Sequence, residues 1–64
     1  MRKVYIRAEP QLHRIFVVYF DRKKHTRYCA AQFDDRVKTI ADVEQYVRAD
    51  NTLQLVCAIS GGAL

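Results

Sequence analysis

Glycine, proline, cysteine and tryptophan are scarce in this sequence of 64 residues, which has two glycines, one proline, two cysteines and no tryptophan. It contains no glycine-rich segment of the kind that binds phosphate groups. Two cysteines allow at most one disulfide, and neither C-x-x-C nor H-x-x-x-H, common spacings of zinc ligands, occurs. The longest apolar run is far shorter than the roughly 20 residues that span a bilayer. These absences argue against a disulfide-rich, zinc-binding or membrane-spanning protein.

Groups suited to catalysis are equally few. Ser60 is the only serine, and no base lies near it in the sequence. His25 and Cys29 are four residues apart on one expected strand, about 13 Å, which is too far for both to bind one ion through bonds of about 2.0–2.3 Å. Cys29 and Cys57 both fall on strand faces that we expect to be buried, as small apolar residues. We therefore expect a protein that is not an enzyme and that needs no metal or cofactor.

The chain is organised around two strand-like segments, 14–20 and 26–33, joined by a charged turn. The first has six consecutive apolar residues, 15–20, rich in the β-branched and aromatic types that favour strands. Alternation divides them into two apolar faces, Ile15, Val17 and Tyr19 against Phe16, Val18 and Phe20. A strand with one solvated face would alternate with polar residues, so we expect 14–20 to be a central strand covered on both sides. The turn lacks Asn-Gly and Asp-Gly, which favours a loop of four or five residues.

Alternation also predicts which residues share a face in the other strands. In the second strand of the hairpin, Arg27, Cys29, Ala31 and Phe33 are expected on one face. In the last strand, Leu53, Leu55, Cys57 and Ile59 are expected on one face. We expect this strand to run parallel to the strand that precedes the helix.

One helix is predicted at 39–49, beginning at Thr39 as N-cap with Asp42 three residues later, a variant of the capping box. Its apolar stripe consists of Ile40, Val43, Tyr46 and Val47. Asn51 is expected to end the helix in a left-handed conformation. With strands at 3–8, 14–20, 26–33 and 52–59, the sequence predicts a single small α+β domain over 1–59 and a flexible tail over 60–64. Its sheet should have three to four mostly antiparallel strands, in the order strand, strand, strand, helix, strand, with the helix on one face.

The segment 51–56, followed by Gly61-Gly62, resembles the last strand and the Gly-Gly tail of ubiquitin and the small sulfur carriers. The resemblance covers roughly a fifth of the chain and implies a β-grasp protein whose terminal glycine carboxylate is activated. The sequence departs from that family in having Ala63-Leu64 after the glycines and no strand between the helix and the last strand. A ubiquitin-like or sulfur-carrier-like β-grasp protein with a Gly-Gly tail is therefore a further alternative, and no activity is assigned from the resemblance.

Charge is distributed unevenly along the chain, whose formal net charge is +4. Residues 1–27 carry +6 and residues 28–64 carry −2, which indicates an acidic partner for the first half. The candidate nucleic-acid-binding residues are Arg22, Lys23, Lys24 and Arg27 at the hairpin, with Lys3, Tyr5 and Arg7 on the first strand. Cations and a ring together suit phosphates and a stacked base. The alternatives are a solvated loop and an edge strand whose charges discourage aggregation.

Two functions from different classes are therefore open. The first is a non-enzymatic regulatory or accessory protein that binds DNA or RNA through its basic hairpin. The second is a small accessory protein, of the kind carried by phages and mobile elements, that binds an acidic surface of a host protein and inhibits that protein. The doubly apolar strand and the small core of a chain this short predict a homodimer. The charged start of the chain lacks the apolar segment of a signal peptide. We therefore expect a cytoplasmic protein with reduced thiols and no membrane partner.

Overall fold

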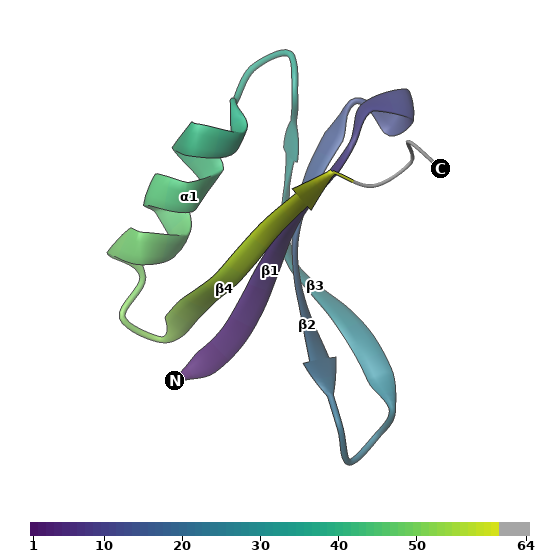
Figure 1. Ribbon diagram of the computed structural model, residues 1–64, viewed down its shortest axis with the longest axis vertical. Helices are drawn as coiled ribbons and strands as arrows, with labels where there is room; N and C mark the ends of the chain where they lie inside the picture. Colours follow the sequence, from purple (N-terminus) through teal and green to yellow (C-terminus); the bar gives the residue numbers. More distant parts are fainter. Residues whose placement is uncertain (61–64) are drawn as a thin grey trace.

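The computed structural model describes residues 1–60 and shows a four-stranded sheet with one helix packed against it (Figure 1). The elements are β1 (Arg2–Glu9), a short 3-10 turn (Pro10–Leu12), β2 (Arg14–Asp21), β3 (Thr26–Asp34), α1 (Ile40–Ala49) and β4 (Leu53–Ser60). Every predicted strand or helix end lies within one residue of the observed end. The predicted α+β fold is confirmed. Ser60, assigned to the tail, ends β4, and the Gly61-Gly62 pair lies outside the described residues.

The strand order is β3-β2-β1-β4, which makes β1 and β2 the central strands. β1 pairs antiparallel with β2, and β2 pairs antiparallel with β3 in the predicted hairpin. After β3 the chain crosses over through α1 and returns as β4, which pairs with β1 in parallel. A crossover of this kind is required because a tight turn can join only antiparallel strands. β4 therefore runs parallel to β3, as predicted, although the two strands are the opposite edges of the sheet.

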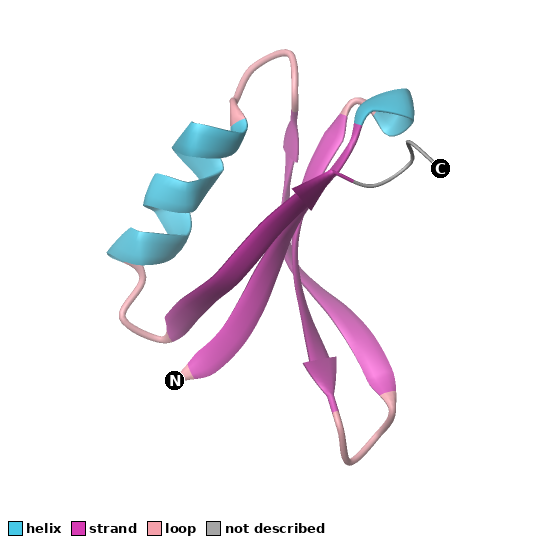
Figure 2. Cartoon of the chain, in the orientation of Figure 1, coloured by secondary structure: helices cyan, strands magenta, loops and turns pink. Residues whose placement is uncertain are grey.

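The core lies between α1 and one face of the sheet (Figure 2). Its buried residues are Val4, Ile6, Ala8, Ile15, Val17, Val43 and Val47. α1 begins with the predicted capping box, in which Thr39 Oγ1 accepts from the Asp42 backbone N–H at 3.1 Å and Asp42 Oδ2 accepts from the Thr39 N–H at 2.9 Å. At ten residues, this one helix of the described chain is too short and too polar to cross a membrane.

The helix differs from the prediction at its edges. Val43 and Val47 are buried, but Ile40 is 38% exposed and Tyr46 is 48% exposed, so only part of the predicted stripe enters the core. Tyr46 lies at the rim, with its ring edge against Phe33 at 5.2 Å between centroids. Ile40 is the first residue of α1, and Tyr46 lies beside the line joining the two buried valines, so both are at the edge of the apolar stripe.

The predicted left-handed ending at Asn51 is wrong. Among the described residues other than glycine, only His13 and His25 have a positive φ. Asp50 is the C-cap, in an extended conformation with φ −93°. Its Oδ1 accepts hydrogen bonds from the Thr52 backbone N–H at 2.8 Å and from the Thr52 hydroxyl at 2.6 Å. This local side-chain turn directs the chain into β4 without a left-handed residue.

Two irregularities change the predicted strand faces. Val17 pairs with Ala31 whereas Val18 pairs with Cys29, and the register shifts there. A similar shift separates Val4 and Tyr5 in their pairing with β4. Because an extra residue reverses the alternation between its two sides, three residues that were expected on buried strand faces are exposed instead. They are Cys29, Cys57 and Ile59.

Candidate nucleic-acid interface

The sheet face opposite α1, which we call the open face, is formed by alternate residues of all four strands. Its central row crosses the sheet from Cys29 through Val18 and Tyr5 to Cys57. One neighbouring row is Gln32, Phe16, Arg7 and Ile59. On the other side, Arg27 pairs with Phe20. β2 is thus a central strand as predicted, but within the described chain only one of its two apolar faces is covered.

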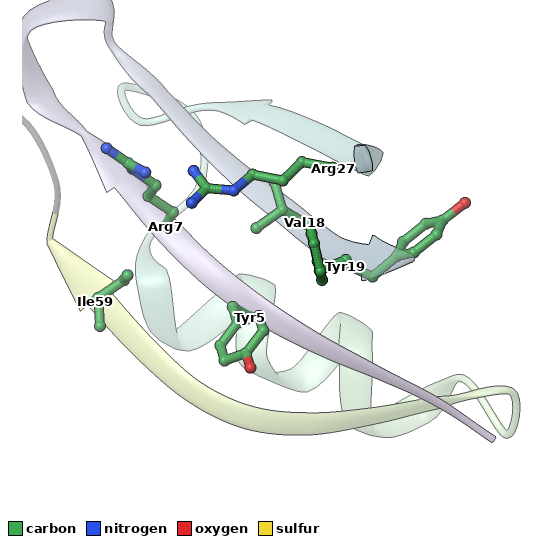
Figure 3. Close-up of a pocket in the computed structure, with 7 residues that line it drawn as sticks. Tyr5, Arg7, Val18, Tyr19, Arg27 and Ile59 are labelled. Carbon is green, nitrogen blue, oxygen red and sulfur yellow. The ribbon is translucent and has the colours of Figure 1, made fainter. Parts of the chain in front are cut away.

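A depression of about 430 Å³ lies on the open face, with α1 behind the sheet (Figure 3). It is lined by Tyr5, Arg7, Val18, Tyr19, Phe20, Arg27 and Ile59. The residues Tyr5, Phe20 and Ile59 are 38%, 48% and 49% exposed. The depression therefore combines accessible rings, an aliphatic side chain and two guanidinium groups. Its size lies within the range of small-ligand sites.

At the end of the open face near Glu9 and Asp34, the arginines and the carboxylates form ion pairs with one another. Arg7 Nε donates to Glu9 Oε1 at 2.6 Å, which leaves the two terminal nitrogens of Arg7 free of that bond. Nearby, Asp34 receives two guanidinium hydrogen bonds from Arg36, at 3.0 and 2.9 Å, and lies 3.4 Å from Arg14. Hydrogen bonds from the Arg36 side chain, and to a smaller extent from its backbone N–H, keep the pKa of Asp34 well below its usual value. The carboxylates at this end are therefore already paired.

The other end of the open face carries uncompensated positive charge. Among residues 1–60, the ion pairs involve Arg7, His13, Arg14, Arg36 and Arg48. Five predicted site cations form no such pair there: Lys3, Arg22, Lys23, Lys24 and Arg27. Lys3 lines a second depression together with Phe20, Arg22 and Lys23, which joins the open face to the hairpin turn. Phe20 lines both depressions, so Lys3, Arg22 and Lys23 adjoin the depression that Arg27 lines, and Lys24 follows them in the turn.

The hairpin turn has four residues, Arg22 to His25, as predicted. Asp21 Oδ1 accepts from the backbone N–H groups of Lys23 and Lys24 at 2.9 and 3.2 Å. His25 has a φ of 50°, a left-handed conformation that histidine tolerates better than most residues. The Asp21 carboxylate therefore organises the backbone of the turn, while the charged side chains project from it.

The far side of the hairpin is reinforced by aromatic contacts. Tyr19 stacks on Tyr28 with centroids 5.2 Å apart and an interplanar angle of 22°. The guanidinium carbon of Arg2 lies 4.2 Å from the centroid of the Tyr19 ring, a cation–π contact. These contacts lie in the part of the hairpin that extends beyond α1 (Figure 1) and connect β2 to both β3 and the start of β1. Arg2 also lines the second depression, beside Lys3, Arg22 and Lys23.

The structure brings the predicted residues together in two groups. Lys3, Tyr5, Arg7 and Arg27 lie on the open face, and Arg22, Lys23 and Lys24 lie in the adjoining turn. The interpretation of Lys3 and Arg7 as edge-strand charges is wrong, because β1 lies between β2 and β4.

Sequence reasoning missed Phe20 and Ile59 as site residues. Phe20 could have been found, because its position next to the basic turn puts an aromatic ring beside the cations. Ile59 gave no such signal, because its face depends on the irregularity in β4.

Comparison of the chain with protein-family models, with curated proteins and with solved structures finds no match. Within residues 1–60, no three side chains from histidine, cysteine, aspartate and glutamate are grouped so that they could bind a metal ion. The open face and the basic turn are therefore the features on which a function is argued.

Proposed function

We propose that this chain is a non-enzymatic nucleic-acid-binding module, acting as a regulatory or accessory protein. The observation that supports the proposal is the continuity of the unpaired cations with the exposed rings of the open face. Phosphates are bound by such cations, and rings such as Tyr5 and Phe20 suit the faces of bases. The carboxylates nearest to this surface, Glu9 and Asp21, are engaged by Arg7 and by the turn backbone.

The turn provides the first test. Replacing Lys23 and Lys24 by alanine should weaken binding to labelled oligonucleotides of any sequence, measured by fluorescence anisotropy across a salt series. The slope of log K against log salt should fall by about one for each phosphate that the variant no longer neutralises. The fold should persist, because exposed loop substitutions usually change stability by less than about 0.5 kcal/mol.

The matched control removes the same charge elsewhere. Lys38 precedes α1, and Arg48 lies on it, 3.9 Å from Glu44. Replacing these two residues by alanine lowers the net charge as much as the turn variant does. If both double variants bind alike and have the parental salt slope, the turn is not a phosphate-binding element.

The second candidate is a small accessory protein that binds and inhibits a host protein. Exposed apolar side chains on the open face, Phe20 and Ile59 among them, favour it. Salt distinguishes the two candidates, because an apolar interface responds little to ionic strength whereas phosphate contacts respond steeply. A pull-down from lysate with and without nuclease applies that distinction directly.

The homodimer stays a prediction. One face of β2 is covered by α1, and the other, with Phe16, Val18 and Phe20, faces away from it. Sedimentation at high micromolar concentration tests self-association, and a monomer there would count against it.

A further inference from the structure

We propose that the ligand of the open face is a single-stranded nucleic acid, whose unpaired bases stack on Tyr5 and Phe20 while the surrounding cations bind its phosphates. This inference rests on the proposed function and specifies its ligand class. In a duplex the base faces are already stacked on one another, so a protein ring reaches them only when the strand is unpaired.

Tyr5 differs from the other tyrosines in its surroundings. Tyr19 and Tyr28 stack on each other, and Tyr46 contacts Phe33. Among the described residues, Tyr5 has no aromatic partner, and it lies in the middle row of the open face. A large ring that contributes to neither the core nor an aromatic pair is available for a ligand.

The cations are spaced around Tyr5 in a way that suits a nucleic-acid backbone. Lys3 and Arg7 are the next residues on the same face of β1, each about 7 Å along the strand from Tyr5. Arg7 Nε donates to Glu9 Oε1 at 2.6 Å, which orients the guanidinium group. The terminal nitrogens of Arg7 can then bind a phosphate, or the guanidinium plane can stack on a base. Arg27 reaches the same depression from β3. The ring is therefore flanked by positive charge from two strands.

A second copy of the chain is the competing occupant of this face. A two-fold face-to-face dimer would place the same patch against itself, which would bring Lys3, Arg7 and Arg27 close to their own copies. The carboxylates that could offset them are already bonded, Glu9 to Arg7 and Asp34 to Arg36. Like charges brought together at an interface are unfavourable, so the charge favours a polyanion on this face.

The experiment compares one mixed sequence as single-stranded DNA, as single-stranded RNA and as a DNA duplex, by fluorescence anisotropy across the same salt series for each ligand. Tyr5→Ala and Phe20→Ala should each weaken single-strand binding by roughly 5- to 150-fold, the range given by base–aromatic stacking. Tyr5→Phe should restore most of the affinity at that position, because it keeps the ring. Tyr46→Ala is the matched control, since Tyr46 and Phe20 are both 48% exposed. It should bind like the parent.

Each result has a distinct meaning. A preference for single strands that is reduced by removing either ring, while the salt slope stays unchanged, supports the inference. If the Lys23/Lys24 variant binds weakly but both ring variants bind like the parent, or if the duplex binds as tightly, the inference is overturned and the proposed function stands. If no nucleic acid binds at low salt, the proposed function fails as well. If sedimentation shows a dimer that Phe20→Ala dissociates, a second copy occupies the face and the inference is overturned.

Discussion

Val18 lies opposite Cys29 across the β2–β3 hairpin, although its neighbour Val17 lies opposite Ala31. The extra residue, Ala30, reverses the alternation of β3 and places Cys29 on the open face. The irregularity in β4 does the same for Cys57. The two thiols are therefore at the two ends of one row of residues across the sheet, about 14 Å apart at a spacing of about 4.8 Å per strand.

We expect both cysteines to react with a thiol reagent such as DTNB in the folded protein, because both side chains are exposed. The same stoichiometry should be obtained in denaturant, and oxidation should give no disulfide within one chain, because the two thiols are too far apart. Reaction of either cysteine only after unfolding would contradict the observed strand faces. Protection of both thiols by an oligonucleotide would support a ligand on the open face.

Ile6 and Ile59 are chemically identical but lie on opposite faces of the sheet. Ile6 is fully buried in the core, and Ile59 is 49% exposed. Ile6→Ala should lower the free energy of unfolding by about 2–5 kcal/mol, whereas Ile59→Ala should change it by less than about 0.5 kcal/mol. Urea unfolding followed by circular dichroism measures both. Equal destabilisation by the two substitutions would show that Ile59 belongs to the core.

The capping box at the start of α1 should contribute measurably to stability. Thr39→Ala removes the acceptor for the Asp42 N–H and should cost about 1 kcal/mol. Thr39→Ser keeps the hydroxyl and is the control, expected to be close to the parent. Thermal unfolding compares the three proteins, and an unchanged Tm for Thr39→Ala would mean that the cap is dispensable.

Stability should fall in acid. Asp34, Asp42 and Asp50 each have a pKa below the usual value of 3.8, because of hydrogen bonds from Arg36, from the Thr39 backbone N–H and from Thr52 respectively. The unfolded chain therefore takes up protons at these sites before the folded chain does. Their stabilisation is complete above about pH 4 and is lost as the pH falls further towards the folded-state pKa values.

Thermal unfolding between pH 6 and pH 2 measures this dependence. Asp34→Asn should reduce the decrease of Tm in acid, because it removes the group with the strongest arginine contacts. A Tm that rises as the pH falls from 4 to 2 would be inconsistent with the hydrogen bonds described for the three carboxylates.

The sequence by itself determined the local elements of this protein. The apolar run at 15–20, the Thr39–Asp42 pair and the charged turn each specify their structure through contacts between near neighbours. The helix and all four strands accordingly have their predicted bounds to within one residue. The sequence also indicated the cations and Tyr5 as a candidate site, because their residue types alone suggest a polyanionic ligand.

Only the tertiary structure decided which strands lie beside β1 and which side chains of β3 and β4 share a face. The position of β1 between β2 and β4 depends on the parallel return through α1, a contact between the two ends of the chain that no local pattern encodes. The exposure of Cys29, Cys57 and Ile59 depends on two irregularities in strand pairing. One unpaired residue puts the side chains before it and after it out of alternation, so a period of two along the sequence assigned these three residues to the wrong face.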